Sequence, residues 1–167
     1  MNNNINKMPY LYNNNYIYST SKNNNTVFMN EFDVPINRDE AFLEIYIFTE
    51  RGQYAIPGAA ITIYVMKDNN FVPVYYLTSE NYPITISLPV AHPLGTLIRG
   101  PMYYFTTYYI TVEANNFAPC RVNNLRLFEG ITTKFDINMF EIIPGQTPVP
   151  ETIINIPPHP RDIIIGP

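Results

Sequence analysis

The sequence lacks tryptophan and contains one cysteine, Cys120, among its 167 residues. A single cysteine excludes an intramolecular disulfide framework. We expect Cys120 to be a small, partly buried apolar residue, and the alternative is an intermolecular crosslink or a reactive thiol. Charged residues are also scarce, at 14%, with only 10 Lys and Arg and a net charge of −4. No basic stripe is present, so we expect no nucleic-acid partner.

Long apolar runs are missing as well. None of the apolar stretches is long enough to span a bilayer, so we expect no membrane span. The first residues, MNNNINKMPYLYNNN, contain no apolar region of the kind that a signal peptide needs. We therefore expect that export, if it occurs, follows lysis or another route. The length is sufficient for one domain with a sizeable core.

Catalytic and metal-binding patterns are absent from the sequence. His92 and His159 lie far apart and each neighbours a proline, so we expect two solvent-exposed loop histidines and no metal site. No Ser or Cys motif offers a nucleophile with a base, and the 7 glycines form no phosphate-binding loop. We therefore expect a protein that is not an enzyme and has no cofactor.

The most informative stretch is residues 103–117, YYFTTYYITVEANNF, which predicts one long strand followed by a turn. Tyr108, Ile110 and Val112 alternate with polar or outward-facing residues, the period expected of a half-buried strand. Residues 67–70 predict a polar hairpin loop, and Pro73 predicts an edge strand or a bulge because proline cannot donate to a ladder. We expect the other strands at residues 41–49, 59–66, 71–78, 84–88, 118–124 and 131–140, with the last of these ending the sheet structure.

Two segments of different composition flank the predicted domain, which covers residues 39–143. Residues 1–38 alternate three Asn triplets with aromatic clusters, so they form either a floppy tail or an adhesive arm. Residues 144–167 are rich in proline and isoleucine and are expected to be extended. Their apolar steps either lie along the domain's own sheet or add a strand to another molecule's edge.

The cluster Tyr103, Tyr104 and Phe105 contains more aromatic side chains than one strand can point inward. Such rings either cover a sheet face and receive the terminal segments, or form a patch for a partner protein or for glycan stacking. The candidate partner-binding residues are Tyr10, Tyr12, Tyr16, Tyr18, Tyr103, Tyr104, Phe105, Ile163, Ile164 and Ile165.

Two blocks of the sequence carry a family resemblance. Residues 57–64, PGAAITIY, and residues 107–139, with Val112-Glu113-Ala114 and Phe128-Glu129-Gly130, resemble the carboxypeptidase-regulatory-like, transthyretin-related β-sandwich domains, also called prealbumin-like or CnaB-like. Asn116 stands where that family usually has glycine. The resemblance implies an all-β, single seven-stranded-type β-sandwich, here with extended N- and C-terminal arms, and no enzyme activity.

The tail gives the resemblance a biological setting. The residues Ile156-Pro157-Pro158-His159 resemble the segment that follows this domain in proteins of spore-forming anaerobic bacteria. In those proteins the domain accompanies spore-cortex-lytic or peptidoglycan-binding modules. The resemblance implies a bacterial spore or cell surface location. We expect a structural or adhesive homo-oligomer or polymer that assembles by strand addition, with peptidoglycan or spore proteins as further partners. The alternative is an accessory module that tethers a spore-cortex-lytic or peptidoglycan-processing partner.

Overall fold

The computed structural model describes residues 35–36, 38–49, 52, 54–80, 82–147 and 149–162. All of these residues belong to one compact unit, within residues 31–167. This part of the chain is all-β, with ten strands and one short 3-10 helix, η1 (Pro160–Asp162). The all-β fold class that the sequence predicted is confirmed.

The first sheet has three strands with β1 at its centre. β1 (Glu40–Thr49) pairs antiparallel with β4 (Ile84–Pro89) and parallel with β9 (Thr132–Met139). Alternate residues of β1 are fully buried, as the period-two pattern predicted.

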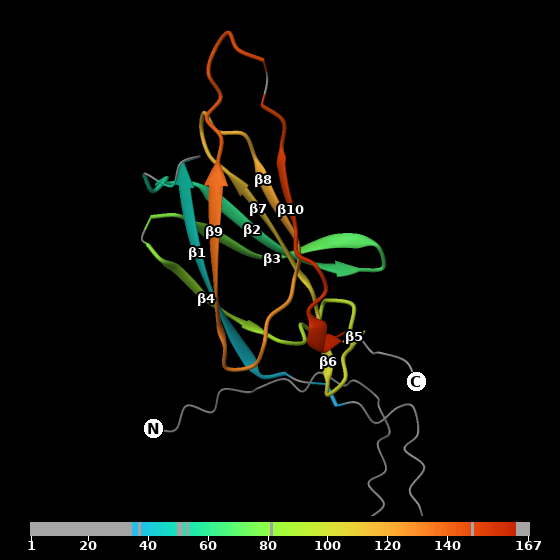
Figure 1. Ribbon diagram of the computed structural model, residues 1–167. Helices are drawn as coiled ribbons and strands as arrows, with labels where there is room; N and C mark the ends of the chain where they lie inside the picture. Colours follow the sequence, from blue (N-terminus) through green and yellow to red (C-terminus); the bar gives the residue numbers. More distant parts are fainter. Residues whose placement is uncertain are drawn as a thin grey trace, which may run out of the picture. The chain divides into compact units, whose positions relative to one another are not determined.

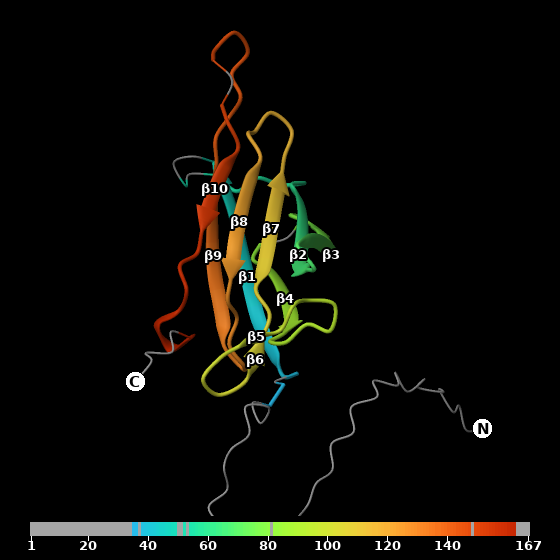
Figure 2. The same ribbon diagram turned by 90° about the vertical axis from the view of Figure 1, so that its right-hand side faces the viewer.

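The second sheet has five strands in the order β10 (Thr152–Asn155), β8 (Cys120–Leu125), β7 (Tyr108–Glu113), β2 (Ala60–Lys67) and β3 (Asn70–Thr78). All neighbours are antiparallel except β10 and β8, which run parallel. The two larger sheets face each other, and a small sheet of β5 (Ile98–Arg99) and β6 (Tyr104–Phe105) lies at one end of them (Figures 1 and 2).

One hydrophobic core lies between the two larger sheets, which gives the described part a β-sandwich-like arrangement. Burying each such aliphatic side chain contributes about 1.5–3 kcal/mol, so this shared layer is the main stabilising element of the fold. Its fully buried members include Leu43, Ile45, Ile47, Leu88 and Ile137 from the first sheet, and Ile61, Ile63, Val65, Ile110, Val112 and Val122 from the second.

Two local predictions, a hairpin turn and the position of a proline, are confirmed by the backbone. Asp68 and Asn69 have φ angles of 49° and 62°, as a tight two-residue hairpin requires, and they join β2 to β3. Pro73 lies on β3, an edge strand of its sheet, and the register of the ladder shifts between Ile63 and Tyr64 opposite it. The edge position and the irregularity both follow from the missing proline N–H.

The prediction of one long strand over residues 103–117 is wrong. The chain forms β6, leaves the ladder at Thr106 and Thr107, and then forms β7. The backbone N–H of Thr106 donates to Val90 O at 3.0 Å, and its hydroxyl accepts from the N–H of His92 at 3.1 Å. The residues after β4 therefore hold Thr106, while β6 pairs with β5 instead of β2.

The tail also adds a strand that the sequence analysis did not assign. We expected residues 131–140 to be the last strand, but β10 follows and extends the five-stranded sheet beside β8. The described part of the two larger sheets therefore has eight strands, where the resemblance implied seven. Of the two alternatives for the tail, packing on the domain's own sheet is the one observed for Thr152–Asn155.

Several predictions fall on residues outside the described part. Tyr10, Tyr12, Tyr16, Tyr18, Ile163, Ile164 and Ile165 all lie there. Among the residues that the structure describes, no helix is long and apolar enough to cross a membrane.

Candidate functional site

The aromatic cluster at β6 lies where both ends of the described chain come together. Phe105 is buried, while Tyr103 and Tyr104 are half-buried. The backbone N–H of Tyr104 donates to Pro35 O at 2.9 Å, and Ile36 forms a parallel bridge with Tyr104. The backbone of the segment that leads into β1 therefore contacts the small sheet at β6. The roles of the rings stay predictions, because the contact at Tyr104 is made by the backbone.

Arg126 lies beside this cluster and carries a buried positive charge. Its guanidinium carbon is 3.4 Å from the centre of the Phe105 ring, 4.7 Å from that of Phe128 and 5.5 Å from that of Tyr103. Ring faces attract cations electrostatically, and the attraction is strongest where water is excluded. We call Tyr103, Phe105, Arg126 and Phe128 the Arg126 cluster.

The charge of Arg126 is balanced by the C-terminal part of the chain. Arg126 Nε donates to Asp162 Oδ2 at 3.0 Å, and the two side chains are only 7% and 11% exposed. A second guanidinium nitrogen, Nη1, donates to Leu127 O at 2.8 Å. The His159 ring meets Phe128 edge to face, with centroids 4.7 Å apart. Asp162 is therefore held by a charge-assisted bond in a largely dry setting, the stronger class of such contacts.

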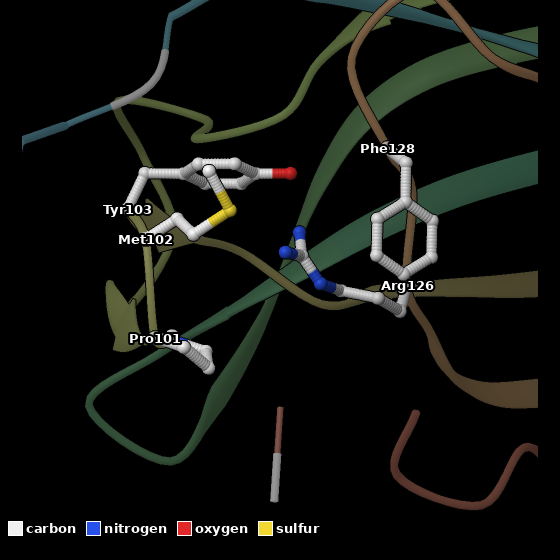
Figure 3. A pocket seen from close by; sticks show the side chains of 6 residues that line it. Pro101, Met102, Tyr103, Arg126 and Phe128 are labelled. Carbon is white, nitrogen blue, oxygen red and sulfur yellow. The ribbon is translucent and has the colours of Figure 1, made fainter. Parts of the chain in front are cut away.

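A shallow pocket of about 220 Å³ opens beside the Arg126 cluster, lined by Gly100, Pro101, Met102, Tyr103, Arg126 and Phe128. Figure 3 shows the guanidinium of Arg126 reaching toward Tyr103 and Met102 across this space. Met102 is 76% exposed at its mouth. The walls are mainly apolar, and Tyr103 and Arg126 are the ionisable side chains among these lining residues.

The edge of the five-stranded sheet at β10 is the second notable feature. The N–H groups of Thr152 and Ile156 donate to Pro119 O and Asn123 O on the β8 side. Since backbone groups alternate in direction along a strand, those of Ile153 and Asn155 point away from β8. The Ile153 side chain is 53% exposed. Within the described residues this is an unpaired strand edge, the kind that accepts another strand.

Two further titratable residues are buried away from these features. His92 is 7% exposed, so the prediction of an exposed loop histidine is wrong for it; its ring lies edge to face with Tyr75 and Tyr108. Burial lowers the pKa of His92.

Cys120 is fully inside the core, which confirms its expected packing role. Burial raises the pKa of its thiol to about 11, with a smaller contribution from Glu151. Among the described residues no group of three or more His, Cys, Asp or Glu side chains could hold a metal ion.

The sequence analysis missed Arg126 and Asp162. A signal was present, because Arg126 is a lone cation in the apolar run Leu125-Arg126-Leu127-Phe128, and Asp162 is the sole acid after Glu151. A cation flanked by apolar residues is buried only where an acid reaches it. The sequence did not show which acid this would be.

The chain was also compared with known proteins. No family model matches it. No curated protein matches it either.

Proposed function

We propose that this chain is a non-enzymatic structural or adhesive subunit that self-assembles by strand addition through its terminal segments. The observation that carries the proposal is β10: a piece of the tail, Thr152–Asn155, adds in register to the edge of a sheet formed by other parts of the chain. Main-chain hydrogen bonds supply the affinity in this mode of recognition, and alternate side chains supply the specificity.

The outer edge of β10 supports a further step of the same kind. The outward backbone groups of Ile153 and Asn155 can pair with an extended segment of another copy, and Ile153 offers exposed apolar surface there. Natural proteins usually protect such an edge with charge, proline or a bulge. The four residues of β10 contain neither proline nor charge.

The N-terminal side supports the proposal independently. Pro35 and Ile36 contact β6 through the backbone, so the segment entering the domain uses strand-like pairing as well. Tyr104, proposed from the sequence as a partner-binding residue, makes this contact, and the other two candidates there, Tyr103 and Phe105, are its neighbours in the chain. The remaining candidates, including Tyr10, Tyr16 and Ile164, belong to the segments that would reach neighbouring copies.

The biological setting is part of the proposal and rests on the sequence resemblance. We place the subunit in a layer or appendage of a bacterial spore or cell surface. The second candidate function is a module that tethers a spore-cortex-lytic or peptidoglycan-processing partner. Its discriminating property is that binding to peptidoglycan or spore protein would survive in a chain that stays monomeric.

Light scattering and negative-stain microscopy test the proposal on the full chain and on two shortened chains, 35–167 and 1–162. Both shortened chains retain every described residue, so a change in assembly cannot be attributed to loss of the core. We expect oligomers or filaments from the full chain. A loss of assembly in one shortened chain assigns it to the segment removed there, and assembly in both shortened chains assigns it to the described residues, β10 among them. A full chain that stays monomeric at every concentration would contradict self-assembly and direct the search to pull-downs with peptidoglycan.

A backbone variant sharpens this test. Ile153→Pro removes an N–H that points away from β8, so it blocks outward pairing without removing a hydrogen bond to β8. The matched control, Ile153→Ala, loses the apolar side chain but keeps the N–H. We expect assembly that uses the outer edge of β10 to fall more for the proline variant than for the alanine variant.

A further inference from the structure

The C-terminal segment, defined as residues 149–162, packs on a surface of the domain that we call the acceptor. Leaving this surface uncovered is unfavourable. Arg126 is the centre of this acceptor, with its side chain 7% exposed among three aromatic rings. Removing the partner of a buried charge costs several kcal/mol, because the charge is left without compensation. The acceptor therefore requires a carboxylate, and Asp162 supplies it.

The contacts of the C-terminal segment are concentrated on one strand and its ends. Thr152 and Ile156 donate to backbone oxygens of residues 119 and 123, and Asn155 accepts from the side chain of Asn123 at 2.9 Å. Glu151 pairs with Arg121 at 3.0 Å. Each of these partners belongs to β8 or directly precedes it, and Arg126 directly follows it. The segment thus needs residues 119–128 of an acceptor, from its own copy or from another.

The connection that joins this segment to β9 has few ties. Residues 141–147 are all exposed, and the connection projects beyond the ends of the sheets (Figures 1 and 2). Ile142 N–H donates to Asn116 O. Within the described residues that follow, up to 147, Gln146 N–H donates to Ile143 O and closes a turn at Gly145, whose φ is 84°. Pro144 and Pro150 favour an extended backbone. Straightening this connection breaks one turn and exposes little that is buried now.

From this combination we propose that the C-terminal segment is exchanged between copies. In the assembled form, residues 149–162 of one copy lie on β8 of the next, and Asp162 of the first pairs with Arg126 of the second. The inference rests on the proposed function and names its contact and its partner, which is a second copy of this chain. Exchange replaces each contact within one copy by the same contact between two copies. Its free-energy cost is therefore confined to opening the connection and to bringing two copies together. A transfer that does not close into a ring generates a filament.

The single native cysteine makes the exchange directly measurable. Thr152 is the register partner of Cys120 on the neighbouring strand, so Thr152→Cys places two thiols on the same face of adjacent strands. Oxidation within one copy leaves a chain of monomer mass on a non-reducing gel, whereas oxidation between copies gives covalent dimers and longer ladders. Peptide mapping identifies links between residue 152 and Cys120. The control, Thr152→Cys with Cys120→Ser, can form only links between two copies of residue 152.

A second pair of cysteines, placed on the surface, tests the same contact if the buried pair folds poorly or oxidises slowly. Asn123 and Asn155 are register partners with an exposed side-chain hydrogen bond. The variant Asn123→Cys, Asn155→Cys, Cys120→Ser therefore reports on the same contact from the surface.

We expect inter-copy links in the assembled fraction of both variants. While exchange is rare, the share of all chains that carry such a link should rise up to about tenfold for each tenfold increase in protein concentration. Assembly in which all links stay within one copy would overturn the exchange and leave the proposed function standing. A wild-type chain that never assembles would overturn the proposed function itself, so the two failures are distinguishable.

Discussion

The pairing of Arg126 with Asp162 gives the most quantitative prediction. Asp162→Ala leaves a guanidinium that is buried among rings and keeps one hydrogen bond, to Leu127 O. Breaking a buried pair by removing one partner costs about 3–5 kcal/mol, and the remaining bond and ring contacts place this case near the lower end. We expect the free energy of unfolding to fall by about 3 kcal/mol.

A double-mutant cycle isolates the pair itself. Arg126→Met removes the charge and keeps an unbranched apolar chain against the rings, and it serves as the second single variant. The coupling energy between positions 126 and 162 should be about 2–3 kcal/mol, because both side chains are largely shielded from water.

The assay is urea unfolding followed by circular dichroism and tyrosine fluorescence, since the chain has 14 Tyr and no Trp. With a urea slope of about 2 kcal/mol/M, the loss for Asp162→Ala lowers the midpoint by about 1.5 M. A coupling energy below about 0.5 kcal/mol, the value of an exposed ion pair, would refute the reasoning. The segment would then be held mainly by the backbone contacts of β10.

Three other predictions follow from one closely packed glycine and two buried side chains. Gly95→Ala should lower the free energy of unfolding by about 1–3 kcal/mol in the same assay, because its Cβ would lie 2.3 Å from Thr106 Cγ2; an unchanged midpoint would contradict this packing. Because burial lowers the pKa of His92 below 6.5, the folded state binds fewer protons, so stability should decrease as the pH falls through 6.5; His92→Gln should lose that part of the pH dependence, and a parallel pH profile would count against it. With a thiol pKa of about 11, Cys120 should react with a thiol reagent about a hundredfold more slowly in the folded chain than in urea, and equal rates would contradict its burial.

The strands that the sequence predicted well are those whose partners leave a local pattern. β1 and β2 alternate buried and outward residues up to their last residue. The turn between β2 and β3 is determined by two residues that tolerate positive φ. In these cases the information lies within a few residues of the element that it specifies.

The errors occurred where a distant residue decides the local structure. Nothing in residues 103–117 indicates that Thr106 bonds to Val90 and His92, and those contacts are what divide the stretch into β6 and β7. His92 was expected to be exposed because it precedes a proline, but the rings of Tyr75 and Tyr108 enclose it. The candidate site shows the same limit, since Tyr103 and Phe105 were identified but the cation between them was not.

The parallel pairing of β1 with β9 has a consequence for how the chain is made. The central strand of the three-stranded sheet is among the first parts of the domain to be synthesised, but one of its two neighbours ends at Met139. Roughly 90 residues separate the two strands, and a ribosome adds about 5–20 residues per second, so β1 waits on the order of 5–20 s for that neighbour. Such distant pairing also makes folding slow. During this interval the nascent chain presents Leu43, Ile45 and Ile47 with an incomplete sheet around them, which makes it a substrate for holding chaperones until translation passes residue 139.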